Sequence, residues 1–268
     1  MVFFNEVIGA QATMADTFYD DFLSRLEASQ SVKRDGFYPA IAIHSPYSVH
    51  PALIKRALAY AVQHKLITSA HYMESPAERE WLESNSGEFE PFFKEFLKQE
   101  YSVNTSKEFL DLFKGKPTLM THVVQANDEE LKQLSQDGHS VIHCPISNRL
   151  LGNGAIDLEQ LDANSVPWVM GTDGLSSNYA LDLMEEMKIA LFMHADADLL
   201  PLAKELLASA TSKSAAALGL NTGEIAVGRE ADLLVLDLEA TPNEQLALHL
   251  LLHGYNIEKI YINGNEVS

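Results

Sequence analysis

Cysteine is almost absent from this sequence. Its 268 residues include one cysteine, Cys144, which excludes a disulfide within the chain and is typical of a protein in a reducing cytosol. Long apolar runs are also missing, because no stretch reaches the roughly 18–20 residues that span a bilayer. The first residues, MVFFNEVIGAQATMAD, lack a basic region ahead of an apolar core, so they do not form a signal peptide. We therefore expect a cytoplasmic location and no membrane partner.

Basic residues are few. The 19 lysines and arginines stand against 38 aspartates and glutamates, which gives a formal net charge of -19 at pH 7. A surface of this sign repels phosphate backbones, which argues against a nucleic acid as the main partner but leaves a small uncharged nucleoside open. Hydrophobic residues make up 46% of the chain, enough to bury a large core.

Apolar, strand-like runs alternate with helix-like runs along most of the chain. The strand-like runs are FFNEVIG, YPAIAIHS, LITSAH, TLMTHVV, SVIHCP and PWVMGTD. This alternation is typical of an α/β protein with a parallel sheet covered by helices on both faces. After residue 218 the pattern changes, because TGEIAVG, ADLLVLDL and IEKIYING predict a small β segment. We therefore predict one domain at residues 1–218 and a C-terminal β segment at residues 219–268.

Imidazole or carboxylate groups stand at the ends of the last five strand-like runs. They belong to His44, His71, His122, His143 and Asp173. In such a sheet the chemistry lies at the carboxyl ends of the strands, so these groups should meet at one rim. A single histidine would be explained more simply as a hydrogen-bonded structural residue. Imidazole and carboxylate together suit Zn²⁺ or Fe²⁺ and leave a position open for water.

The motifs around these residues resemble a known family. HSPYSV, HYMES, HCPISN and GTDGLSSNYALDLMEEMK follow one another as in the amidohydrolase superfamily, in the branch of adenosine-type and cytosine-type deaminases and chlorohydrolases. GEIAVGREADLLVLDL resembles the β-sandwich segment of that family. The resemblance covers essentially the whole chain and implies a (β/α)8 TIM-barrel fold. The first barrel strand of the family carries a His-x-His ligand pair that this sequence lacks, so we expect an incomplete barrel containing strands three to eight.

The resemblance implies roles for the residues at the rim. His71 and Asp173 would be metal ligands for one Zn²⁺ or Fe²⁺ ion per complete site. Without the His-x-His pair, we expect metal binding by this chain alone to be weak or absent. Glu74 would contact the substrate and carry a proton to it. His122 would orient the attacking water, and Asp173 would also accept a proton from that water. For Glu74 a simpler alternative stays open, namely a glutamate in the first turn of a helix that interacts with the helix dipole.

Other residues have weaker implied roles. His44 would contact the substrate near its ribose, and Arg149 would bind a substrate carboxylate through a bidentate fork. The alternative for His44 is a purely structural role. The alternative for Arg149 is an ion pair at the surface. His143 and Cys144 are interpreted as packing residues.

The implied reaction is the metal-dependent hydrolytic deamination of an adenine nucleoside, with aminodeoxyfutalosine of menaquinone biosynthesis as the expected substrate. Methylthioadenosine, adenosylhomocysteine, another deaminated or dechlorinated heterocycle, and an inactive fragment without the His-x-His pair are the open alternatives. An open sheet would expose two edges that barrel closure normally removes. We therefore expect a homo-oligomer, or pairing with the missing N-terminal segment, beside the small-molecule substrate.

Overall fold

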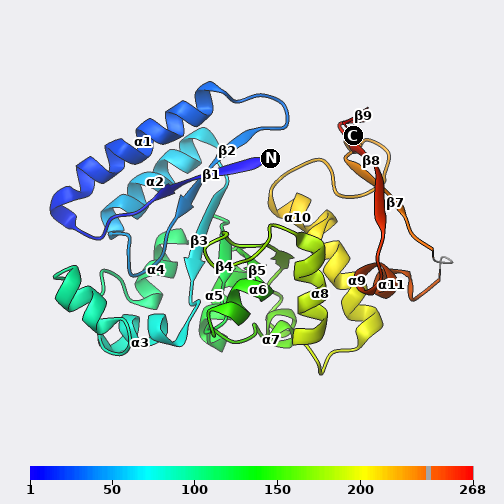
Figure 1. Cartoon of the computed structure of the whole chain (residues 1–268). Coiled ribbons are helices and arrows are strands. Elements are labelled where there is room, and N and C mark those ends of the chain that lie inside the picture. The colour runs from blue at the N-terminus through cyan, green and yellow to red at the C-terminus, as the bar shows by residue number, and fades with distance from the viewer. Residues whose placement is uncertain (240–242, 268) are drawn as a thin grey trace. The chain divides into compact units, whose positions relative to one another are not determined.

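The chain folds into two compact units. A computed structural model describes residues 1–239 and 243–267. Unit one comprises residues 1–142 and 152–167, and unit two comprises residues 143–151 and 168–268. Most elements of each unit are labelled in Figure 1. The predicted boundary between residues 218 and 219 stays a prediction.

Six strands form the main sheet in the order β1–β2–β3–β4–β5–β6. Their bounds are Val2–Val7, Tyr38–Ile43, Thr68–Tyr72, Leu119–His122, Ser140–His143 and Trp168–Met170. Each strand pairs in parallel with the next from β1 to β5. The predicted α/β class, with the parallel strands of an incomplete barrel, is confirmed.

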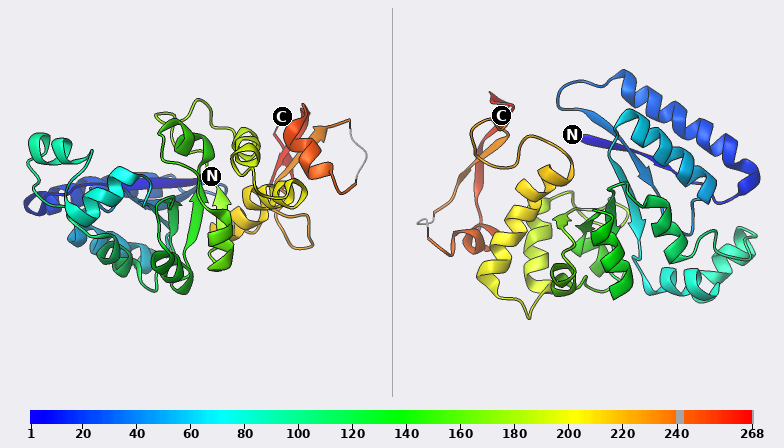
Figure 2. Two further views of the ribbon diagram at one scale, coloured as in Figure 1. Left: turned by 90° about the horizontal axis from the view of Figure 1, so that it is seen from below. Right: turned by 180° about the vertical axis from the view of Figure 1, so that it is seen from behind.

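Helices follow the strands of unit one. They are α1 (Ala15–Ser31), α2 (Pro51–His64), α3 (Pro76–Ser84), α4 (Ser106–Phe113), α5 (Asp128–Gln136) and α7 (Leu158–Ala163), with the 3-10 turn η1 (Ala12–Met14) and the π-helix η2 (Pro91–Phe96). Figures 1 and 2 show α1 and α2 side by side along β1 and β2. In the sequence NDEELKQLSQ, Asn127 stands three residues before Glu130, a spacing that predicts a capped helix start. Asn127 does cap α5, because its side chain accepts hydrogen bonds from the backbone N–H groups of Glu129 and Glu130.

Alternate residues of the strands face opposite sides of the sheet. Val7, Ile43 and Tyr72 are buried, whereas Glu6 and His71 are half-buried. The face that carries Glu6 and His71 is therefore the one with polar side chains near the carboxyl ends of the strands.

Unit two combines β6 with helices and a separate antiparallel sheet. Its helices are α6 (Pro145–Leu150), α8 (Leu183–Met193), α9 (Leu199–Ala210), α10 (Ser212–Ala217) and α11 (Leu246–Leu252). The sheet contains β7 (Leu233–Asp237), β8 (Asn256–Ile262) and β9 (Asn265–Glu266). In the described part of the chain, no helix has the length and apolar composition needed to cross a membrane.

One strand predicted for this region does not form. TGEIAVG is an irregular segment, although ADLLVLDL and IEKIYING do contain strands. Gly223 and Gly228, at φ 91° and 88°, take left-handed conformations that interrupt extended backbone. Ile225 and Val227 between them are almost fully exposed, so no neighbouring element packs on their apolar side chains.

Each unit also buries one tryptophan. In unit one, the Trp81 ring stacks on Phe93 with their centroids 4.8 Å apart. In unit two, Trp168 packs edge to face against His143 at 6.5 Å. Both indoles therefore belong to the core of their own unit.

Candidate metal centre and substrate site

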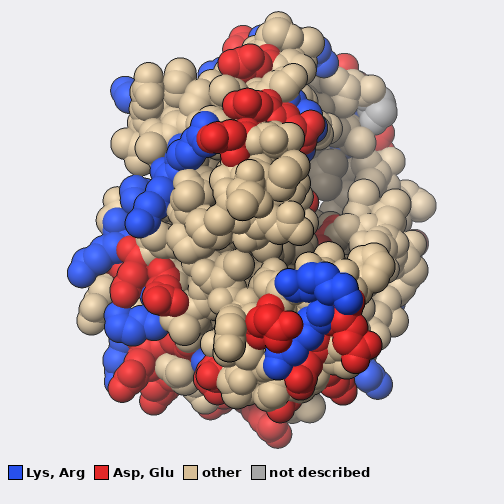
Figure 3. All heavy atoms as spheres, turned by 90° about the vertical axis from the view of Figure 1, so that its left-hand side faces the viewer, with Lys and Arg blue, Asp and Glu red and all other residues tan. Residues whose placement is uncertain are grey.

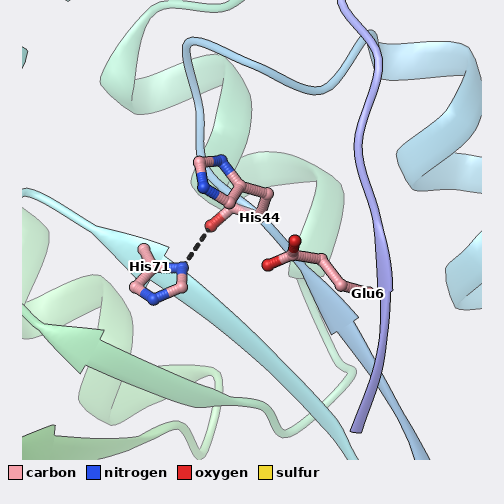
Figure 4. A group of neighbouring side chains, drawn as sticks. All are labelled: Glu6, His44 and His71. Atoms are coloured by element: carbon pink, nitrogen blue, oxygen red, sulfur yellow. Dashed lines mark hydrogen bonds between the residues drawn. The ribbon is translucent and has the colours of Figure 1, made fainter. Parts of the chain in front are cut away.

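The carboxyl ends of β2 and β3 bring two imidazoles together. His44 directly follows β2, and its ring centroid lies 5.4 Å from that of His71 in β3. Nδ1 of His71 lies 2.7 Å from the backbone oxygen of His44. Figure 4 draws this hydrogen bond as a dashed line. Because a carbonyl oxygen can only accept a hydrogen bond, Nδ1 carries the proton. In the neutral ring, Nε2 of His71 then has a free lone pair, as a metal ligand requires.

Glu6 joins these two histidines from β1. One ligand atom from each of Glu6, His44 and His71 lies within 4.8 Å of the other two. Figure 4 shows the Glu6 carboxylate directed toward the two rings. One carboxylate and two imidazoles form a donor set that suits a divalent cation. Sequence reasoning missed Glu6, because only the pairing of β1 with β2, which sets Glu6 opposite Ala42, brings it close to His44.

His44 is held as a neutral ring. Its Nδ1 atom lies 2.6 Å from the hydroxyl of Ser48 and 3.0 Å from that of Ser45. Burial, and then the neighbouring His71, lowers the pKa of His44 to about 4, with Glu74 opposing this shift. At neutral pH the ring is therefore uncharged and can exchange hydrogen bonds with a ligand.

Glu74 and His122 meet on the other side of His71. The Glu74 Oε1 atom accepts a hydrogen bond of 3.1 Å from Nδ2 of Asn153 and lies 3.7 Å from Nε2 of His122. The rings of His71 and His122 stack with their centroids 5.4 Å apart. Unit one thus gathers His44, His71, Glu74 and His122 into one cluster.

Backbone strain marks the same strand ends. Met73, His122 and Val123 have φ values of 50°, 73° and 56° in unit one, and Asp173 has a φ of 57° in unit two. Non-glycine residues rarely adopt this left-handed conformation, which costs of order 1–3 kcal/mol and tends to occur at functional sites. The strain points to the same positions as the side-chain geometry.

Glu78 fixes the backbone that carries Glu74. Its carboxylate is fully buried and accepts hydrogen bonds from the backbone N–H groups of Met73, at 3.0 Å, and Glu74, at 2.7 Å. Burial raises the pKa of Glu78 to about 7, although these two hydrogen bonds oppose the shift. Glu78 therefore positions Glu74 through its backbone.

The titration of Glu78 gives a testable change of stability with pH. We expect the free energy of unfolding of the wild-type protein to fall by about 3 kcal/mol, relative to that of Glu78→Gln, as pH rises from about 4.5 to about 7. In this window the folded protein holds a proton that the unfolded chain, with its ordinary pKa of 4.5, has already released. Urea unfolding of both proteins across this range measures the difference. Parallel pH profiles would show that Glu78 does not titrate there.

Asp173 stands in unit two, in the loop after β6. Its Oδ2 atom accepts hydrogen bonds from the hydroxyls of Ser147, at 2.6 Å, and Ser177, at 2.7 Å. Buried Glu186 braces the surrounding loop by accepting from the Asn178 side chain and from the Ile146 backbone. The carboxylate of Asp173 is thereby held in one orientation. Joint metal ligation by Asp173 and His71 stays a prediction.

The remaining predicted residues also lie in unit two. The buried His143 ring lies 3.1 Å from His194, between their Nε2 atoms, and contacts Trp168, which agrees with a packing role. Cys144 is buried at the start of α6. Arg149 is exposed near the end of α6. Its contact with a substrate carboxylate stays a prediction.

Comparison with known proteins gives consistent results. A model of the amidohydrolase family matches residues 9–267. The chain is 51% identical over 268 residues to an aminodeoxyfutalosine deaminase of a Nitratiruptor species, covering 99% of this chain and 66% of that protein.

Two solved structures resemble the fold. The crystal structure of Helicobacter pylori aminofutalosine deaminase in complex with methylthio-coformycin superimposes with a TM-score of 0.94 at 34% identity, covering 100% of this chain and 66% of that one. An adenosine deaminase from Xanthomonas campestris with bound zinc gives a TM-score of 0.75 at 27% identity, covering 92% and 56%. The chain therefore spans between about half and two thirds of the length of these proteins.

Proposed function

Because the chain belongs to the amidohydrolase family, we propose that it catalyses the hydrolytic deamination of an adenine nucleoside. The cluster of His44, His71, Glu74 and His122 at adjacent strand ends carries this proposal. It unites a candidate metal ligand with a carboxylate that can move a proton. The 51% identity to an aminodeoxyfutalosine deaminase supports aminodeoxyfutalosine as the substrate, in menaquinone biosynthesis.

The proposal includes a divalent metal, for which Zn²⁺ is the first candidate because a related adenosine deaminase binds zinc. The residues fit such an ion, because Nδ1 of His71 donates its proton to a backbone carbonyl. Nε2 of the same ring is then unprotonated and can bind the metal. We assign Asp173 as a second ligand. Of the group formed by Glu6, His44 and His71, only His71 is assigned to the metal, and His44 is assigned to the substrate. When bound, the metal would lower the pKa of a water molecule so that hydroxide becomes available near neutral pH.

The protein's own residues would handle the protons. Water oxygen adds to C6 of the purine while Glu74 delivers a proton to N1. Asp173 accepts a proton from the water, and His122 orients it. Asp173 then passes its proton to the amino nitrogen, the bond between C6 and that nitrogen breaks, and ammonia leaves. The hydroxyl on C6 returns a proton to Glu74 as C6 becomes a carbonyl carbon. His44, whose ring is uncharged at neutral pH, would hydrogen-bond to the ribose. Each group acts by general acid–base catalysis or by positioning.

The assay for this proposal is ammonia release by the zinc-loaded protein. We expect the highest kcat/KM with aminodeoxyfutalosine and lower values with methylthioadenosine, adenosylhomocysteine and adenosine. Removal of zinc by a chelator should abolish the activity, and added zinc should restore it. Inosine, which has no amino group at C6, is the matched control. Absence of ammonia from every adenine nucleoside would overturn the proposed function.

Location and assembly form the last part of the proposal. We propose a cytoplasmic enzyme that forms a homo-oligomer or pairs with a preceding segment. The net charge of -19 supports a small-molecule substrate over a nucleic acid. On the face shown in Figure 3, acidic and basic side chains are interspersed around a broad uncharged area, which agrees with this choice.

A further inference from the structure

A row of aromatic rings leads away from the candidate metal ligands in unit one. Ring centroids lie 5.4 Å apart between His122 and His71, 5.4 Å between His71 and His44, and 6.0 Å between His44 and Tyr47. Tyr47 in turn meets Phe89 edge to face at 5.2 Å. The proposed proton carrier, Glu74, lies at the His122 end of this row. At the other end the rings of Tyr47 and Phe89 are uncharged, although the carboxylates of Glu78, Glu74 and Glu6 lie near enough to act on Tyr47.

Phe89 belongs to a lobe built around an uncommon helix. The π-helix η2, drawn in teal in Figure 1, follows Phe89 directly, and the backbone N–H of Leu97 donates to the carbonyl of Phe92 five residues earlier. π-helical turns are rare and occur often at functional sites. Phe93 anchors the lobe by stacking on buried Trp81 and by contacting Tyr47 at 5.7 Å. Phe89 itself stays half-buried.

The loop that carries Tyr47 is fixed to the same lobe. Buried Asn104 donates from Nδ2 to the backbone oxygens of Pro46, at 2.7 Å, and Val49, at 2.9 Å. These bonds enclose the position of Tyr47 from both sides. Burial, with the charge of Glu78 next, raises the pKa of Tyr47, so its ring stays uncharged. Tyr47 and Phe89 are both half-buried and held in place by their neighbours, so together they form a preorganised aromatic wall.

The shape of an adenine nucleoside determines which part of it lies against Tyr47 and Phe89. The reacting C6 and N1 atoms must lie by Glu74 and His122, and the sugar is attached at the opposite end of the purine. The ribose then lies toward His44, and whatever extends from its 5′ position lies toward Tyr47. The adenine nucleosides considered above differ at that position.

We propose that Tyr47 and Phe89 form the specificity subsite for the 5′ substituent of the nucleoside, and that this subsite favours a flat aromatic group over a small one. The inference rests on the proposed deaminase function. It identifies residues that set the choice of substrate, distinct from those that move protons. Stacking of two aromatic rings contributes about 0.5–1.5 kcal/mol beyond area burial, which corresponds to about a two- to tenfold preference per ring.

The test compares two nucleosides in the zinc-loaded protein. 5′-Deoxy-5′-(phenylthio)adenosine presents a ring at the 5′ position, and 5′-deoxyadenosine presents only a methyl group. We expect the ratio of their kcat/KM values to fall by about two- to tenfold in Tyr47→Leu and in Phe89→Leu. Tyr47→Phe keeps the ring and should keep the ratio of the wild type. The matched control is Phe96→Leu, which removes an exposed ring of the same lobe that stacks on Phe92.

The outcomes separate this inference from the proposed function. A ratio that is unchanged in both Tyr47→Leu and Phe89→Leu, or that falls equally in Phe96→Leu, overturns the subsite. If the wild-type protein deaminates neither nucleoside, the proposed function fails instead. Isothermal titration calorimetry with the same two compounds then decides the subsite. Weaker binding of the phenylthio compound by Phe89→Leu than by the wild type supports it, and equal binding overturns it.

Discussion

Glu74→Gln should lower kcat for an adenine nucleoside by about 10²- to 10⁴-fold while the metal content stays at the wild-type level. Glutamine preserves the shape of the side chain, and its oxygen can still accept the hydrogen bond that Asn153 donates at 3.1 Å. It cannot carry a proton to N1 of the purine. Steady-state kinetics together with metal analysis of the same preparation measure both quantities.

Glu95→Gln is the control for this experiment, because it makes the same chemical change at an exposed position of η2. It should leave kcat unchanged. Near-normal turnover of Glu74→Gln would show that Glu74 is only a helix-start residue, held above α3 by its backbone bond to Glu78. A parallel loss of metal would indicate that Glu74 acts as a ligand.

The second large effect is expected for His71→Ala, which should lose metal and activity together. Loss of a residue that only orients a metal ligand typically costs 10–100-fold in metal affinity, so removal of the ligand itself should cost at least about 100-fold. The imidazole of His71 is fixed by its hydrogen bond to the His44 carbonyl, and no other atom of that side chain could replace Nε2. Equilibrium dialysis against Zn²⁺ measures the affinity.

His64→Ala, at the exposed end of α2, removes an imidazole without touching the cluster and should keep full metal content. Asp173→Asn distinguishes the two roles proposed for that residue. A loss of metal like that of His71→Ala identifies a ligand, whereas a loss of kcat at full metal content identifies a proton acceptor. Wild-type metal affinity in His71→Ala would refute the metal centre as proposed.

The sequence predicted the elements that carry strong local signals. Each apolar run that ends in His44, His71 or His122 forms or adjoins a strand of the parallel sheet, and the capping residue Asn127 starts a helix as its spacing requires. These features depend on local periodicity and on the common direction of parallel strands. Local patterns therefore indicated which residues stand at neighbouring strand ends.

Features that depend on contacts distant in sequence were not predictable in this way. Glu6 reads as a single polar residue inside FFNEVIG, and only the pairing of β1 with β2 places it beside His44 and His71. The wall formed by Tyr47 and Phe89 depends on hydrogen bonds from Asn104 across more than fifty residues of chain. TGEIAVG has the composition of a strand but does not form one. Gly223 and Gly228 adopt left-handed conformations that interrupt an extended backbone, and the apolar side chains between them are exposed.

The two buried tryptophans provide an optical reporter for each unit. They are the only tryptophans of the chain, with Trp81 in unit one beside the π-helical lobe and Trp168 in unit two. Substitution of one by phenylalanine leaves an intrinsic fluorescence signal that originates from the other unit. In Trp168→Phe, the emission of Trp81 would follow the unfolding of unit one by itself and respond to ligands that reach Phe93 and its neighbours.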